Sequence, residues 1–273
     1  MFGKVRSFIR SGHGSLSRHK DLDAYIQEFA GLIPIDETCP EDVFIVGYPK
    51  SGNTWMQNLL SGLIYGLAPE YLPPILLEEQ IIPDVHRHRY YRRFGTPMYF
   101  KSHYLPRPEY RRVIYLLRDG RDVMVSYLHY LRAFEHQEEI EFSDMVRTAR
   151  NLFPCKWHEH VTAWQSNPYR VEMMTLKYED LLVAPVQQLL RISEFLSITR
   201  PMSLIESVIE KSSFASMRTK EEGFCRGNPM RERDKFFVRR GVRGSYKDEM
   251  PQQVLDLFLA DATDALRAVG YLS

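Results

Sequence analysis

The sequence predicts a single α/β domain in which a parallel β-sheet is flanked by helices on both faces. Short apolar segments of strand length alternate along the chain with longer segments of helical periodicity. The first apolar segment is continuously hydrophobic, as in parallel strands that are covered on both sides. It leads into a glycine-bounded loop and then a helix, a P-loop-like arrangement in which backbone N–H groups can bind a phosphate.

Length and charge limit the possible classes of protein. The 273 residues, of which 44% are hydrophobic, suit one large domain. We place this domain at residues 21–273, after a basic arm at 1–20 that we expect to be mobile. The formal net charge of +1 gives no global reason to expect binding to nucleic acid, so any anion binding must come from local clusters.

Cysteine usage and hydropathy predict a cytoplasmic protein without a membrane span. Cys39, Cys155 and Cys225 lie far apart and show no CxxC spacing, which favours a reducing compartment over a disulfide framework or a zinc site. The basic N-terminus lacks the apolar core of a secretory signal. No apolar run reaches the roughly 18 to 20 residues that a membrane span requires.

The elements that the pattern predicts can be given in chain order. We expect a short helix at 21–30, a turn-rich segment at 34–40, a strand at 43–48, a helix at 53–65 and an irregular segment at 66–97. Next come strands at 98–102 and 112–117, a helix at 122–134, a long helix at 142–166 and a strand at 170–177. Helices at 185–196 and 201–211, a basic loop at 218–247 and a final helix at 251–269 complete the prediction.

The loop between the first strand and its helix is the first candidate for chemistry. Gly47 and Gly52 have the spacing of the nucleoside-triphosphate loop GxxxxGK[ST], but Asn53 stands where its lysine belongs. The lysine is Lys50, inside the loop. This displacement weakens the assignment to an ATP-dependent kinase, for which Asp119 is the candidate magnesium ligand. An ordinary glycine-containing turn is the simpler alternative.

The segment TyrProLysSerGlyAsnThrTrp (48–55) resembles the 5′-phosphosulfate loop of cytosolic sulfotransferases, YPKSGTTW, with Asn53 as the departure. Four further segments match the family's patterns in the expected order, over roughly residues 40–250. The resemblance implies transfer of a sulfuryl group from 3′-phosphoadenosine 5′-phosphosulfate (PAPS) to a hydroxyl or amine of a small apolar or phenolic acceptor. It also implies 3′-phosphoadenosine 5′-phosphate (PAP) as the product and no metal.

Two of these segments carry the expected catalytic groups. PheLysSerHisTyrLeuPro (100–106) is similar to K-[TV]-H-L-P, which implies His103 as general base and Lys101 as a cation beside the transferring group. LeuLeuArgAspGlyArgAspValMetValSerTyr (116–127) resembles the family's 3′-phosphate segment R-[DN]-x-[RK]-D-x-x-x-S. It implies Arg118 and Ser126 as phosphate ligands, while Arg121 and Asp122 are expected to cap or pair at the helix start. The catalytic set implied is His103, Lys50, Lys101 and Ser126.

The remaining segments concern the adenine and the 3′-phosphate. LysTyrGluAsp (177–180) looks like YEDL, and SerSerPheAlaSerMet (212–217) resembles T-S-F-x-x-M, which implies an adenine held opposite Trp55. PheValArgArgGlyValArgGlySerTyrLys (237–247) is similar to F-[MIV]-R-[KR]-G-x-x-G-[DN]-W-K. For Tyr178 and Phe214, tight packing in the protein core is the alternative to a contact with adenine. The donor-binding set implied is Lys50, Ser51, Gly52, Asn53, Thr54, Trp55, Arg118, Ser126, Tyr178, Ser213, Phe214, Met217, Arg239, Arg240 and Gly241.

Partners and acceptor are less defined by the sequence. The Thr-Val core of the family's dimerisation motif K-x-x-x-T-V-x-x-x-E is missing after residue 247, so the oligomeric state stays open. Segments 66–97 and 219–236 are expected to shape the acceptor pocket together with Tyr104, Tyr127 and Tyr130. A catalytically silent nucleotide-binding protein is a further alternative, against which the presence of Lys50, Lys101 and His103 together argues. Ordinary packing is expected for His86, His88, His136, His158 and His160.

Overall fold

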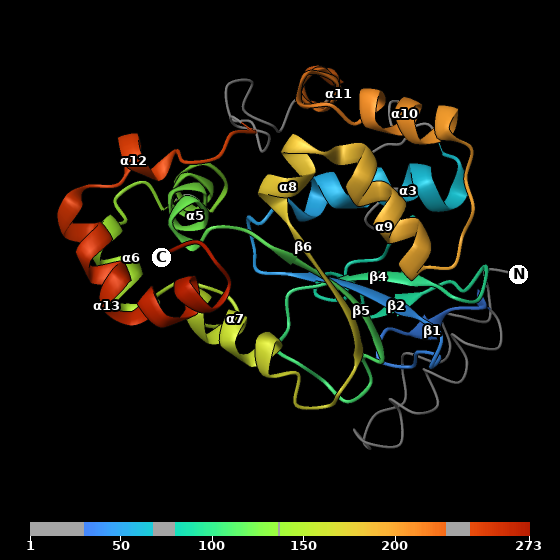
Figure 1. Ribbon diagram of the computed structural model, residues 1–273, viewed down its shortest axis with the longest axis horizontal. Helices are drawn as coiled ribbons and strands as arrows, with labels where there is room; N and C mark the ends of the chain where they lie inside the picture. Colours follow the sequence, from blue (N-terminus) through green and yellow to red (C-terminus); the bar gives the residue numbers. More distant parts are fainter. Residues whose placement is uncertain (1–29, 68–79, 136, 228–240) are drawn as a thin grey trace, which may run out of the picture.

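The computed structural model describes residues 30–67, 80–135, 137–227 and 241–273 (Figure 1). The arm predicted at 1–20 and all but the last residue of the helix predicted at 21–30 lie outside this part of the chain, so both stay predictions. The strands are β1 (Ile33–Pro34), β2 (Val43–Gly47), β3 (Tyr90–Tyr91), β4 (Tyr99–Ser102), β5 (Arg112–Leu117) and β6 (Glu172–Lys177). The helices are α3 (Asn53–Tyr65), α5 (Gly120–Phe134), α6 (Phe142–Thr148), α7 (Trp157–Ser166), α8 (Tyr178–Val183), α9 (Pro185–Phe195), α10 (Met202–Lys211), α11 (Phe214–Gly227), α12 (Tyr246–Glu249) and α13 (Gln252–Ala268).

The central sheet is parallel and has the strand order β4-β2-β5-β6. The chain passes from β2 to β4 on one side, then returns across β2 to β5 and continues to β6. The direction of winding therefore reverses between β2 and β5. In open α/β sheets, ligands bind in the crevice at the carboxyl ends of the two strands that flank such a reversal. The loops that follow β2 and β5 are the two that carry the phosphate-binding patterns.

Alternation of side chains along the strands divides the core into two layers (Figure 1). Phe44 and Val46 point to the face that α5, α6, α7 and α13 cover. Val43 and Ile45 point to the opposite face, which α3, α8, α9 and α10 cover. Successive side chains of a strand alternate between its two faces, so a strand without a polar position must be covered on both. The predicted fold class is confirmed.

Two predicted elements, the long helix at 142–166 and the loop at 218–247, are wrong in part, and the elements β1, β3, α8, α11 and α12 were not expected. The long helix expected at 142–166 is two helices, α6 and α7, because Ala149 and Asn151 between them adopt left-handed φ angles of 57° and 67°. The loop expected from 218 begins later, since α11 continues to Gly227. Helix α8 follows β6 directly and was not expected. The apolar periodicity continues across the break between α6 and α7, which hides it from a reading of the sequence.

Helix α5 begins against the core at a position that only glycine fits. A Cβ at Gly120 would lie 2.5 Å from Trp157 Cδ2 and 2.7 Å from Phe258 Cζ. Trp157 and Phe258 are buried side chains of α7 and α13. Close packing at this point sets how near α5 approaches the other helices of its layer, and α5 carries part of the site described below.

We expect Gly120→Ala to destabilise the fold by about 1–3 kcal/mol, because the new methyl group overpacks a full core. Urea denaturation followed by far-UV circular dichroism would measure the change. Gly95→Ala is the matched control, since a Cβ there meets no heavy atom within 4 Å. Equal midpoints for the two variants would contradict the packing argument.

Candidate active site

The loop after β2 has the backbone shape of an anion cradle. Lys50 and Gly52 both adopt left-handed φ angles, of 70° and 95°. A Cβ at Gly52 would lie 2.7 Å from the ring of Tyr178, so glycine is required there. The Asn53 side-chain amide donates to the carbonyl oxygen of Tyr48 over 3.0 Å and closes the loop. The Ser51 hydroxyl is buried in this loop and has no hydrogen-bond partner among the described residues.

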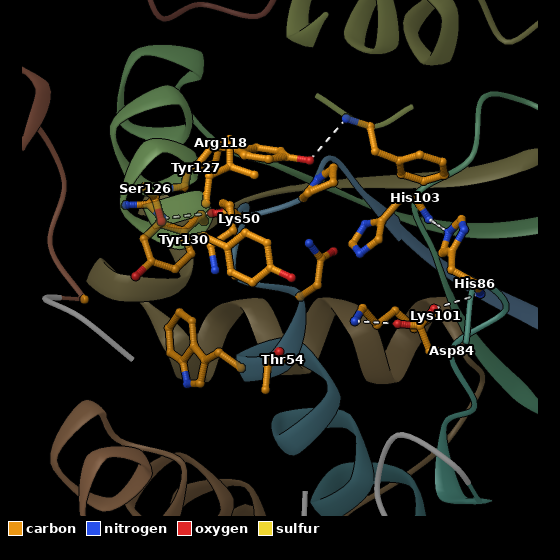
Figure 2. Close-up of a pocket in the computed structure, with 18 of the residues that line it drawn as sticks. Lys50, Thr54, Asp84, His86, Lys101, His103, Arg118, Ser126, Tyr127 and Tyr130 are labelled. Atoms are coloured by element: carbon orange, nitrogen blue, oxygen red, sulfur yellow. Dashed lines mark hydrogen bonds and ion pairs between the residues drawn. The ribbon is translucent and has the colours of Figure 1, made fainter. Parts of the chain in front are cut away.

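A cavity of about 660 Å³ runs from this loop along the carboxyl ends of β2, β4 and β5 (Figure 2). Residues from both halves of the chain line it. At one end stand Trp55, Tyr178, Phe214, Met217 and Gly241, and at the other stand Asp84, His86, Tyr104, Tyr127 and Phe153. Lys50, Lys101, His103, Arg118 and Ser126 also line the cavity. One continuous space therefore contains the candidate donor and acceptor ends.

His103 follows β4 and contacts the end of β2. Its Nδ1 lies 2.5 Å from the carbonyl oxygen of Gly47, which can only accept a hydrogen bond. Nδ1 therefore carries the ring proton, and Nε2 is left as the basic nitrogen of the ring. Burial and the charge of Lys101 hold the pKa of His103 well below its ordinary value. The imidazole is accordingly neutral at neutral pH and can accept a proton.

Lys101 forms a buried ion pair (Figure 2). Its Nζ donates to Asp84 Oδ2 over 2.8 Å, and the two residues are 6% and 2% exposed. Asp84 lies in the segment before β3. Although burial opposes ionisation of Asp84, its pKa is lowered to about 2, because Lys101 attracts the carboxylate and donates to it. The ion pair uses one of the three N–H donors of the ammonium group and leaves two.

Lys50 lies in the cavity near Tyr130 of α5, with its Nζ 4.6 Å from the centre of the ring. Burial, followed by repulsion from Lys101 and Arg118, lowers the pKa of Lys50 to about 7. Three cationic side chains thus converge on one space. A polyanionic ligand would relieve their mutual repulsion.

Arg118 joins three segments at the end of β5. Its guanidinium donates to the carbonyl oxygens of Lys50 over 3.0 Å and Val242 over 3.3 Å. It also lies over the ring of Tyr178, 4.4 Å from the ring centre. Its Nε is buried and has no hydrogen-bond partner among the described residues. That donor remains available to an anion.

Aromatic side chains from several segments form one end of the cavity. The rings of Trp55 and Tyr178 meet at an interplanar angle of 75°, 5.5 Å apart, and the Trp55 indole N–H donates to the carbonyl oxygen of Ser212. A Cβ at Gly241 would lie 2.4 Å from the ring of Phe214. The backbone of Gly241 therefore packs directly on that ring, and its left-handed φ of 64° also favours glycine. This end can accept a flat ring.

The start of α5 has the structural role predicted for it. Asp119 caps the helix and pairs with Arg121 over 2.7 Å, so its carboxylate is engaged. The buried carboxylate of Asp122 accepts from the backbone N–H groups of Gly244 and Tyr246, over 2.6 and 2.9 Å. Asp122 thereby fixes the chain that follows Gly241 beside the cavity.

The cavity gathers most of the predicted site residues. Ser51 and Ser213 are close by but do not line it, and Arg239 and Arg240 lie outside the described residues. His86, for which ordinary packing was expected, stands in the cavity wall. Sequence reasoning assigned the segment of His86 to the acceptor pocket but gave His86 itself no part in the site. The cavity-lining residues that it missed are Pro49, Asp84, His86, Arg87, Leu131, Glu135, Gln137, Asn151, Phe153, Leu182, Val242 and Ser245.

The chain matches the model of the sulfotransferase domain over residues 40–268. It belongs to the sulfotransferase family. Bovine sulfotransferase 1A1 is 26% identical over 88% of this chain and 88% of its own length. Flavonol 3-sulfotransferase of Flaveria bidentis is also 26% identical, over 94% of this chain and 92% of its own. The predicted family and the predicted sulfotransferase activity are confirmed.

Solved structures agree on the fold. Retinol dehydratase in complex with androsterone and the inactive cofactor PAP superposes with a TM-score of 0.68, at 21% identity over 84% of this chain and 82% of that one. Mouse sulfotransferase SULT7A1 complexed with PAP superposes with a TM-score of 0.62, at 19% identity over 87% of this chain and 90% of that one. Within the described residues, no helix is long and apolar enough to cross a membrane.

Proposed function

We propose that this enzyme transfers the sulfuryl group of PAPS to a hydroxyl of a small acceptor, with His103 as general base. The observation that carries the proposal is the hydrogen bond between His103 Nδ1 and Gly47, which leaves the basic Nε2 in the cavity that the phosphate loop also lines. A hydroxyl attacks poorly while it holds its proton, and a positioned base contributes about 10²–10⁴ in rate.

The residues present fit a donor with several phosphate charges. The loop amides at 51–54, the orphaned hydroxyl of Ser51 and the ammonium of Lys50 suit the 5′ end. Arg118 and Ser126, with Arg239 and Arg240 as further candidates, suit the 3′-phosphate. Trp55, Tyr178, Phe214 and Met217 suit the adenine. When bound, PAPS supplies an activated sulfuryl group whose leaving phosphate gains negative charge as the S–O bond breaks.

Electrostatic preorganisation is the main contribution that we assign to the protein. Lys50 lies in the loop, where it can stabilise the charge that grows on the leaving phosphate. Lys101 keeps two N–H donors beyond its ion pair with Asp84, and these can neutralise the sulfuryl oxygens. His103 takes the proton of the acceptor as the bond to sulfur forms.

The acceptor end favours a flat phenolic or aromatic alcohol. Tyr104, Tyr127, Tyr130 and Phe153 supply aromatic walls. Androsterone is bound by retinol dehydratase, and flavonol is named as the substrate class of the Flaveria relative, so ring-containing alcohols occur among the similar proteins. A kinase is less favoured, because the carboxylate of Asp119 is engaged by Arg121.

We also propose a cytoplasmic location. The spacing of the three cysteines supports it, and Cys39 and Cys155 are both free thiols in the structure.

Binding of PAP at pH 8 should take up close to one proton, because Lys50, with a pKa of about 7, is mostly neutral in the free protein and becomes charged beside the phosphates. At pH 6 Lys50 is already protonated, so the uptake should vanish. Titration calorimetry in buffers of different ionisation enthalpy measures it. Lys50→Met should abolish the uptake, whereas the control Lys156→Met, on the surface at α7, should keep it. Undiminished uptake in Lys50→Met would assign the proton elsewhere.

Arg118→Ala should weaken the binding of PAP by about ten- to a hundredfold more than the binding of adenosine 5′-phosphate. The reason is that a charged hydrogen bond to the 3′-phosphate contributes about 1.5–3 kcal/mol. Binding calorimetry with both nucleotides gives the difference. Since Arg118 also holds Lys50 and Val242, a general loss for both nucleotides is expected on top of this. Equal losses for the two nucleotides would remove Arg118 from the 3′-phosphate site.

His103→Ala should abolish sulfation of aliphatic alcohols but reduce sulfation of acidic phenols less, because a phenol that is already partly ionised needs less help from a base. The measurement is the ratio of kcat/KM, variant to parent, across phenols of graded acidity. His158→Ala, outside the cavity, is the control. A ratio that does not depend on the pKa of the acceptor would rule out the general-base role.

A further inference from the structure

His86 stands directly against the candidate base (Figure 2). The two imidazole rings are nearly parallel, at 16°, with centres 5.3 Å apart. The backbone N–H of His103 donates to Nε2 of His86 over 2.6 Å. This contact therefore fixes the backbone of the base itself.

The contact answers a need at the end of β4. The parallel ladder between β2 and β4 stops at the pair Val46 and Ser102, so the N–H of His103 has no strand partner. A buried backbone N–H without a partner is rare, because it loses its hydrogen bonds to water. The side chain of His86 supplies the acceptor that the sheet does not.

The hydrogen bond defines the state of His86. Because Nε2 accepts, the ring proton lies on Nδ1 and the ring is neutral. Burial lowers the pKa of His86 to about 4, the charge of Asp84 opposes this shift, and Lys101 and Arg107 reinforce it. The ring remains an acceptor throughout the neutral range, with Tyr104 and Phe153 packed around it.

Asp84 anchors His86 to the same strand. Its Oδ1 accepts the backbone N–H of His86 over 2.9 Å, while its Oδ2 accepts from Lys101. The backbone of this segment also bonds to β4, through Val85 to Lys101 over 3.0 Å. His86 is thus held by the strand whose last residues it supports.

We propose that His86 is a positioning residue for His103: it accepts the backbone N–H of the base and, with the bond from His103 Nδ1 to Gly47, fixes the orientation of the imidazole. This inference rests on the proposed function. Misplacement of a catalytic group by about 1 Å can reduce the rate about 10²-fold. His86 therefore contributes to turnover without contacting the donor.

The kinetic test compares His86→Leu, which removes the acceptor, with His86→Gln, whose side-chain oxygen can replace Nε2. We expect kcat for weakly acidic phenols to fall about ten- to a hundredfold in His86→Leu and to recover largely in His86→Gln, with the Kd for PAP unchanged. His158→Gln is the matched control and should retain the parent kcat. An unchanged kcat in His86→Leu would overturn the proposal, as would a loss that appears only in KM.

A double-mutant cycle separates positioning from a direct role. If His86 acts through His103, then His86→Leu should cost nothing further in a His103→Ala background. An undiminished loss in that background would mean that His86 acts independently of the base, and the proposal would fail.

Nuclear magnetic resonance of the free protein tests the contact without activity. In ¹⁵N-labelled protein we expect a scalar coupling between the His103 amide nitrogen and His86 Nε2, and a neutral Nδ1–H tautomer of His86 at pH 6. An Nε2–H tautomer would overturn the assignment. If the chain moved no sulfuryl group from PAPS to any phenol, the proposed function would fail, while this measurement would still decide the contact between the two histidines.

Discussion

The hydrogen bond from His103 Nδ1 to the carbonyl oxygen of Gly47 joins the two halves of the site. Gly47 ends β2 and begins the anion cradle, while His103 follows the neighbouring strand β4. A side chain at Gly47 would come within 2.5 Å of Asn53 Oδ1 and 2.9 Å of the carbonyl oxygen of Leu116, so the strand must end in glycine there. The same residue therefore sets the shape of the cradle and the tautomer of His103, the proposed base. Parallel pairing of β2 with β4 brings these two ends to one edge, and everything else in the site is arranged around that edge.

Repulsion among positively charged side chains is a second constraint on the site. Lys50, Lys101 and Arg118 stand in one partly buried space, and repulsion among them opposes protonation of Lys50. Asp84 compensates Lys101 through their ion pair, and the charge of Glu221 offsets part of the repulsion at Lys50. Such an arrangement is unfavourable until an anion arrives, since buried charges are poorly compensated by solvent. A polyanionic donor would then find its counter-charges already in place, which is the condition for electrostatic stabilisation without reorganisation.

Residues proposed to bind the donor from a fixed loop were predictable from the sequence, because their spacing is set by local backbone geometry. His103 and Arg118 follow strands directly and Lys50 and Gly52 lie in the loop after β2, and the structure brings all four to one cavity. His86 and Asp84 were not predictable individually, since they reach the site from an irregular segment whose path depends on tertiary contacts with β4. The break between α6 and α7 could not be predicted for a related reason. The apolar periodicity continues through it, and the side chain of Ala149 does not indicate that the residue adopts a left-handed φ.

The contacts of Arg118 explain why charge alone does not describe the donor end. Its guanidinium donates to carbonyl oxygens at Lys50 and Val242, two positions far apart in the chain, and lies over the ring of Tyr178. A lysine would keep the positive charge, but its compact ammonium group cannot reproduce the wide fork of donors that reaches both carbonyl oxygens while the group lies over the ring. Arg118 therefore assembles the phosphate loop, the chain after Gly241 and the aromatic wall before any ligand binds. The carboxylate of Asp122 completes the same connection by holding Gly244 and Tyr246 from the first turn of α5. Tertiary contacts around the end of β5 thus form this end of the cavity. Its shape follows from the geometry of these hydrogen bonds rather than from net charge.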